Sequence, residues 1–296
     1  MNEPQGNKGP PIIPCSLSAK AKRLIAEYAE DLKAAAHAIG NHGLNEEEFR
    51  DAGIFRAAVE RLRGQQAATM DEKRAFVEAV LDKLKAKKLI EEWAFEGAGD
   101  RHDYRVTMPG GWISIIETKG CLDGNNTTIF ERPANADEFV IWSLCQNPGA
   151  DPRHNAWSGI HTRLSAEIVA KGKLVDGLVI WDMLCGTVGR PCPKISGMKR
   201  KLVRLKRRIV PPPCIYLFPR SIPDPRNNPR PPCHTLRDVR LLHALHLAFG
   251  GHDEEVIAVT MEARLGENGV ERKTSFHRAD QELASSDWTD IRRARG

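Results

Sequence analysis

The chain has 296 residues, of which 41% are hydrophobic and 28% charged, a composition typical of a folded protein with a buried core. No run of about 18 apolar residues occurs, which excludes a membrane-spanning helix, and the polar, proline-rich N-terminus excludes a secretory signal. We therefore expect a cytoplasmic protein. The net charge is +5, and its basic residues are unevenly placed.

The N-terminal part is predicted to be a proline-rich tail over residues 1–15 followed by a helical region over residues 16–70. Apolar residues between Leu17 and Ile39 recur at helical spacing and predict one helix. Asn45 precedes three glutamates and marks the start of a second, because its side chain can cap free backbone N–H groups. The sequence leaves open whether these helices pack on the rest of the chain, contact a partner or form a dimer interface.

A further helix is predicted over residues 72–89, with Asp71 as its N-cap. The apolar residues of its inner face are Phe76, Val77, Val80, Leu81 and Leu84.

A β-hairpin is predicted over residues 103–119. Its turn, residues 109–111, is a proline followed by two glycines. This composition suits a three-residue loop, since proline presets φ and glycine adopts the left-handed conformation. Such a loop pairs Met108 with Trp112, and this pairing sets the register of both strands.

That register would place Asp103 directly opposite Glu117, with Cβ atoms about 5 Å apart. Because strand side chains alternate, Lys119 should project on the face of Glu117 while Thr118 points away. Carboxylates of this kind bind Mg²⁺, which neutralises phosphoryl charge and lowers the pKa of an attacking water. A neighbouring lysine can position that water or stabilise the transition state. The cluster therefore predicts a metal-dependent phosphodiester hydrolase, with a structural ion cluster as the alternative.

Other triplets of an acid, any residue and lysine also occur in the chain. Those ending at Lys33 and Lys73 lie in helical patterns and are predicted to be solvated helix faces. The third triplet, which ends at Lys273, belongs to a later predicted hairpin. There Glu262 should pair with Lys273 and Glu271 with Arg264, as ordinary cross-strand ion pairs.

Asp103, a spacer of about a dozen residues, and Glu117 with Lys119 on the following strand resemble the PD-(D/E)xK nuclease superfamily, especially type II restriction endonucleases. His102 stands where the pattern has proline. The resemblance implies an α/β, restriction-endonuclease-like fold with a mixed central β-sheet flanked by helices. It also implies catalysis by Asp103, Glu117 and Lys119, with Mg²⁺ held by the first two and Glu78 as a candidate additional acid.

The elements after the hairpin agree with this resemblance. Apolar runs predict strands over residues 138–145, 175–184 and 213–218, and helical spacing predicts a helix over residues 155–171. Helix, hairpin, strand, helix, strand is the order that the resemblance implies for a nuclease core, here assigned to residues 71–220.

Residues 221–296 are predicted to form a C-terminal region. A Pro- and Arg-rich loop or linker leads to a helix from Leu236 that ends at Gly250, and a hairpin follows over residues 255–276.

A basic segment over residues 190–208 contains no acid and should attract a polyanion. A solvated helix or loop is the alternative. Asn and Arg side chains can also form hydrogen bonds with the edges of DNA bases. For the pair Asn125 and Asn126, the alternative is that they form a turn. The candidate DNA-binding residues are Asn125, Asn126, Ser158, His161, Arg163, Lys199, Arg200, Lys201 and Arg204.

The seven cysteines show no paired spacing. Cys185, Cys192, Cys233 and His234 form the only weak zinc alternative.

The sequence thus predicts a Mg²⁺-dependent, sequence-specific endonuclease of a restriction-modification system that cuts double-stranded DNA. A homodimer follows from the resemblance, since two symmetric subunits most simply cut both strands of a symmetric site. The alternatives are a repair, recombination or transposon-end nuclease on the same fold, or a non-catalytic DNA-binding protein.

Overall fold

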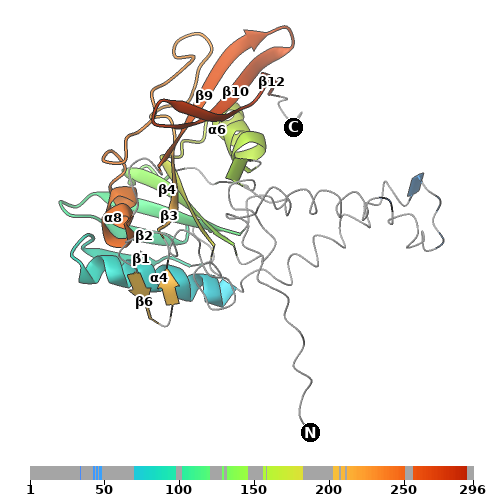
Figure 1. Cartoon of the computed structure of the whole chain (residues 1–296). Coiled ribbons are helices and arrows are strands. Elements are labelled where there is room, and N and C mark those ends of the chain that lie inside the picture. Colours follow the sequence, from blue (N-terminus) through green and yellow to red (C-terminus); the bar gives the residue numbers. More distant parts are fainter. Residues whose placement is uncertain are drawn as a thin grey trace.

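The computed structural model of the chain is an α/β fold built on a mixed sheet of ten strands, with helices on both faces (Figure 1). The predicted tail, and nearly all of the N-terminal helical region, lie outside the residues that the structure describes. The described residues are 34, 43, 45, 47, 48, 70–97, 102–120, 129, 132–145, 156, 157, 159–182, 203–206, 208–210, 212–250 and 256–291.

One feature of the N-terminal region is described. Glu48 N donates to Asn45 Oδ1 at 2.9 Å, and Asn45 N donates to Glu48 Oε2 at 3.0 Å. Glu47 and Glu48 are helical. This reciprocal capping box confirms the helix start predicted at Asn45.

Helix α4 spans Met70–Ala86, and its predicted inner face is buried. Asp71 lies within the first turn, so its assignment as the N-cap was wrong. Acidic residues are also favoured there because they complement the helix dipole. The helix ends earlier than predicted, since Lys88 adopts a positive φ of 58°.

Three antiparallel strands follow: β1 (Glu92–Phe95), β2 (Tyr104–Thr107) and β3 (Ile113–Lys119). Strand β1 was not predicted, because its four residues carry too little pattern. Met108 N donates to Trp112 O at 2.8 Å, which confirms the predicted loop and register at the turn.

Strands β4 (Glu138–Cys145) and β5 (Gly177–Asp182) extend the sheet parallel to β3. They are joined by a crossover whose described helical turns are η3 (Ile160–Leu164) and α6 (Ser165–Lys171). The ends of β3, β4 and β5 therefore lie at one border of the sheet, which we call the carboxyl edge. The predicted strand, helix and strand are confirmed here.

The basic segment contains a small hairpin of β6 (Val203–Leu205) and β7 (Arg208–Val210), outside the main sheet. Val203 and Leu205 are buried in the core that contains α4, whereas Arg204 is exposed. The described part of the segment is thus neither a helix nor an open loop, because alternate apolar residues pack against the protein.

Strand β8 (Cys214–Leu217) pairs antiparallel with β5, and helix α8 spans Arg240–Phe249. The helix was predicted to start at Leu236. It begins later because Thr235 N and Oγ1 both donate to Asp238 Oδ2, at 2.6 and 2.8 Å, in a preceding turn.

Strands β9 (Ile257–Gly266) and β10 (Gly269–Arg278) form the predicted C-terminal hairpin, with β11 (Gln281–Ser285) and β12 (Thr289–Asp290) beside β10. β9 pairs with β8, so this hairpin continues the main sheet.

The predicted register of the C-terminal hairpin is confirmed, because Glu262 pairs with Lys273 and Arg264 with Glu271. Arg264 Nε lies 2.5 Å from Glu271 Oε2. Glu262 forms its ion pair with Arg230, at 2.6 Å.

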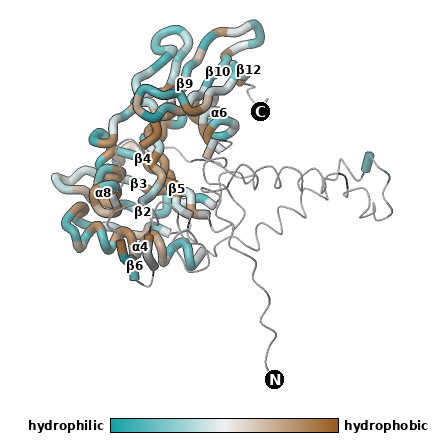
Figure 2. Tube along the Cα trace, viewed as in Figure 1, coloured by the Kyte–Doolittle hydropathy of each residue, from teal (hydrophilic) through white to brown (hydrophobic). Residues whose placement is uncertain are grey.

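Two apolar cores cover the faces of the sheet. Ile116 of β3 and Val140 and Trp142 of β4 pack with α4 and α8, while Ile115 packs with η3 and α6. Figure 2 shows hydrophobic segments within the layers and hydrophilic residues toward the far end of the β9–β10 hairpin. No helix in the described ranges is long and apolar enough to cross a bilayer.

Gly177→Ala should destabilise the protein by about 2 kcal/mol, because it overpacks the contact between β5 and α8. A Cβ at Gly177 would lie 2.3 Å from Leu242 Cδ1 and 3.1 Å from Tyr216 O. Urea unfolding measures the cost. In the double variant with Leu242→Val, the total should be smaller than the sum of the single costs, and simple additivity would contradict this packing.

Candidate functional site

The candidate site lies at the carboxyl edge, where β3 ends beside the start of β2. Glu117 Oε1 and Lys119 Nζ form an ion pair on one face of β3, as strand alternation predicted. The side chain of Glu117 is only 3% exposed and that of Lys119 19% exposed. A buried carboxylate needs such a partner, since the desolvation of a lone charge costs several kcal/mol.

Asp103 lies beside this pair but is not directly opposite Glu117, so that predicted contact is corrected. Asp103 N donates to Ile116 O at 3.0 Å, although the ladder pairs Ile116 with Tyr104. Asp103 and Tyr104 therefore both oppose Ile116, as in a β-bulge. Such a bulge changes the direction of a side chain, here that of Asp103.

The Asp103 carboxylate turns instead to Thr118. Its Oδ2 accepts hydrogen bonds from Thr118 N and Thr118 Oγ1, both at 2.6 Å. Thr118 was predicted to point away from the site, and it is in fact a direct partner of Asp103. Residues 117–119 thus anchor two adjoining pairs, one carboxylate–lysine and one carboxylate–threonine.

The donor atoms of these pairs fit a hard cation. The hydrogen bonds of Asp103 to described residues use only Oδ2, which leaves Oδ1 available as an oxygen ligand. Among the described residues, no group of three or more His, Cys, Asp or Glu side chains could enclose a metal. Mg²⁺ does not require one, because it commonly binds one or two carboxylates and keeps several waters.

His102 replaces the proline of the nuclease pattern, and ion pairs fix the chain at this point. His102 Nε2 pairs with Glu96, which also binds Arg105 Nε at 2.7 Å. Burial alone would raise the pKa of Glu96, but Arg105 and His102 hold it below its usual value. The cluster ties the end of β1 to the start of β2 and so positions Asp103.

Glu78 reaches the same region from α4. Burial, and then the charge of Glu78, raises the pKa of the Tyr104 hydroxyl. Tyr104 and its partner Ile116 face α4, so Glu78 lies on that side of the sheet, whereas Glu117 lies on the other. The structure therefore brings Glu78 close to Tyr104, next to Asp103.

Lys73 is a component of this edge that sequence reasoning missed. It was expected on a solvated helix face, but its side chain is half-buried, and its Nζ would lie 3.6 Å from a Cβ on Gly120. Burial lowers the pKa of Lys73. Gly120 directly follows Lys119, and its carbonyl accepts a hydrogen bond from Ser143 Oγ at 2.8 Å. No sequence spacing relates residue 73 to residue 120.

Three of the predicted DNA-binding residues are described. Arg204 is exposed on β6, and His161 and Arg163 lie on η3. The His161 ring stacks on Trp157, with centroids 5.0 Å apart. Burial, and then the charge of Arg272, lowers the pKa of His161, which favours the neutral ring. The others, Asn125, Asn126, Ser158, Lys199, Arg200 and Lys201, lie outside the described residues.

The zinc alternative receives no support from the two members that are described. Cys233 Sγ donates to Val259 O at 3.3 Å, and burial raises the pKa of the thiol to about 11. His234 Nε2 lies 3.1 Å from Asp176 Oδ1. Cys185 and Cys192 lie outside the described residues.

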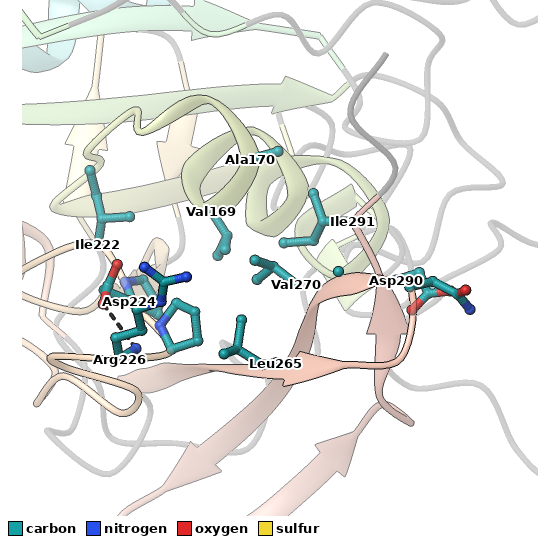
Figure 3. A pocket seen from close by; sticks show the side chains of 13 residues that line it. Val169, Ala170, Ile222, Asp224, Arg226, Leu265, Val270, Asp290 and Ile291 are labelled. Carbon is teal, nitrogen blue, oxygen red and sulfur yellow. Dashed lines mark hydrogen bonds between the residues drawn. The ribbon is translucent and has the colours of Figure 1, made fainter. Parts of the chain in front are cut away.

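A cavity of about 1130 Å³ lies elsewhere, between α6, residues 222–226, the turn of the β9–β10 hairpin and β12 (Figure 3). Its apolar lining includes Val169 and Leu265. The Asp224 side chain stabilises its own turn, since its Oδ1 accepts hydrogen bonds from Arg226 N and Asn227 N at 2.9 and 2.8 Å. Because α6 leads toward the start of β5, this cavity is remote from the carboxyl edge.

No protein-family model matches the chain, and no curated protein or solved structure is significantly similar to it. A function is therefore inferred from its own residues.

Proposed function

We propose that this protein is a Mg²⁺-dependent endonuclease that hydrolyses phosphodiester bonds of double-stranded DNA, most specifically a type II restriction enzyme. The observation that carries the proposal is the desolvated Glu117–Lys119 ion pair beside the Asp103 carboxylate at the carboxyl edge. The site combines the amine of Lys119 with the carboxylates of Asp103 and Glu117. These are the groups that metal-assisted phosphodiester hydrolysis requires.

Asp103 and Glu117 would hold the Mg²⁺ ion. When bound, the ion would neutralise charge on the phosphoryl oxygens and lower the pKa of the attacking water. Lys119 would position that water, since its ammonium already lies against Glu117. Thr118 would keep the Asp103 carboxylate oriented through its N–H and hydroxyl groups.

The surrounding elements support this assignment. The order of α4, the β2–β3 hairpin, β4, the η3–α6 crossover and β5 resembles that of the PD-(D/E)xK core. Arg204 and Lys206 are exposed on the basic hairpin, where they could meet a polyanion.

The substrate class is tested by incubating the protein with unmethylated plasmid, a branched duplex and single-stranded DNA in Mg²⁺. A restriction enzyme gives discrete plasmid fragments. Preferential cleavage of the branched duplex would instead assign the site to a repair or recombination nuclease, and binding without cleavage would assign it to a DNA-binding protein. Sedimentation of the complex tests the proposed homodimer.

Thr118→Val should raise the Mg²⁺ concentration needed for half-maximal cleavage by about tenfold, because groups that orient a metal ligand typically contribute this much to metal affinity. The variant removes one of the two donors to Asp103 Oδ2 and keeps the backbone donor. The measurement is a Mg²⁺ titration of the cleavage rate, with DNA binding measured in parallel. An unchanged Mg²⁺ dependence would remove Asp103 from the metal site.

A further inference from the structure

Lys73 places a second cation at the carboxyl edge. Its half-buried side chain reaches from the first turn of α4 to the backbone just beyond Lys119, where its Nζ would be 3.6 Å from a Cβ on Gly120. Asp71 and Glu72 precede it in the same turn, yet Lys73 forms no ion pair or hydrogen bond with a described residue. A half-buried ammonium with no counter-ion among the described residues is available to bind an anion.

The two lysines approach the edge from opposite faces of the sheet. Even-numbered residues of β3 face α4, so Gly120 continues the α4 side, whereas Glu117 and Lys119 project from the other face. A DNA strand that crosses the edge presents successive phosphates to the two sides.

We propose that Lys73 binds a backbone phosphate adjacent to the one that is cleaved and thereby positions the DNA strand across the carboxyl edge. This inference rests on the proposed function for the identity of the cleaved phosphate. The next residue, Arg74, is stacked over the Phe95 ring, with Cζ 4.2 Å from the centroid. Burial opposes the charged state of Lys73, and a bound phosphate would restore it.

The test compares Lys73→Met with Lys87→Met in binding to fragments of plasmid DNA. Lys87 is exposed, and at about 1.5 Å per residue it lies about 20 Å further along the helix axis than Lys73. This distance exceeds the screening length of about 8 Å at physiological salt. The two variants therefore lose the same charge at different places.

Binding is measured in EDTA, which prevents cleavage, at several salt concentrations. For Lys73→Met we expect about a tenfold weaker affinity, and a slope of log affinity against log salt that is smaller by about one, because one phosphate contact is lost. Lys87→Met should match the wild-type protein. Lys73→Arg keeps the charge and should recover most of the affinity, which a purely structural role would not predict.

An affinity and a salt slope for Lys73→Met equal to those of Lys87→Met would overturn the inference, as would a wild-type protein that binds no duplex. Wild-type protein that binds DNA and shows the Lys73 effect, but cleaves nothing in Mg²⁺, would contradict the proposed function while supporting the phosphate contact.

Discussion

Replacing Lys119 with methionine should reduce the rate of DNA cleavage by about a thousandfold and leave DNA affinity nearly unchanged. Lys119 is the cation that faces the buried Glu117 carboxylate. Removing a group that positions a nucleophile or stabilises developing charge typically costs 10² to 10⁴ in rate, roughly. The measurement is a single-turnover cleavage rate in saturating Mg²⁺, with affinity determined separately.

The matched control for this variant is Lys273→Met. Lys273 belongs to a triplet of the same pattern, but it lies on β10 opposite Glu262. The Lys273→Met variant should therefore cleave DNA at the wild-type rate. Since Lys119→Met leaves Glu117 without its cation, Lys119→Arg is a second test that keeps the charge. A folded Lys119→Arg protein with full activity, together with an active Lys119→Met protein, would contradict a catalytic role.

Glu138→Ala should lower the free energy of unfolding by about 3 kcal/mol. Glu138 is buried at the start of β4, where its carboxylate accepts hydrogen bonds from Ser114 Oγ and, at 2.8 Å each, from Arg240 N and Leu241 N at the start of α8. Alanine would leave these buried donors without an acceptor, at roughly 1 to 3 kcal/mol per group. Urea unfolding provides the measurement.

The exposed neighbour Asp137 supplies the control for Glu138. Its Oδ2 accepts one bond, from Ile113 N at 2.8 Å, so Asp137→Ala should cost about 1 kcal/mol or less. Similar costs for the two variants would contradict the proposed role of Glu138 in joining β4 to α8.

Glu138 also makes stability depend on pH. Burial raises its pKa above 4.5, so the folded state retains a proton that the unfolded chain releases. This contribution is fully present below pH 4.5 and is lost as the pH rises through the higher folded pKa. The stability of the wild-type protein relative to Glu138→Gln should therefore fall as the pH rises from 4.5 through the raised pKa of Glu138. A rise over that interval would contradict the raised pKa.

The sequence predicted the hairpin and the apolar strands because these features depend on local patterns. The proline and two glycines after Met108 determined the loop, and alternation placed Lys119 on the face of Glu117. The runs at β4 and β5 were readable because strands buried on both faces are continuously apolar.

Features that depend on tertiary contacts could not be predicted from the sequence. The bulge at Asp103 leaves no trace in the alternation, so the sequence placed this residue opposite Glu117 and turned Thr118 away. Lys73 meets Gly120 only because α4 packs over the strand end, and its own surroundings in the sequence are those of a solvated turn. Strand β1 was missed because its residues are mostly exposed and lack an apolar pattern.

The most direct measurement is the conversion of supercoiled, unmethylated plasmid by the wild-type protein in Mg²⁺ and in EDTA, with Lys119→Met assayed beside it. The proposed site predicts discrete, Mg²⁺-dependent products that EDTA abolishes and that the variant fails to form. Plasmid that remains intact in every reaction, or cleavage that survives EDTA or the loss of Lys119, would contradict a metal-dependent nuclease centred on Glu117 and Lys119.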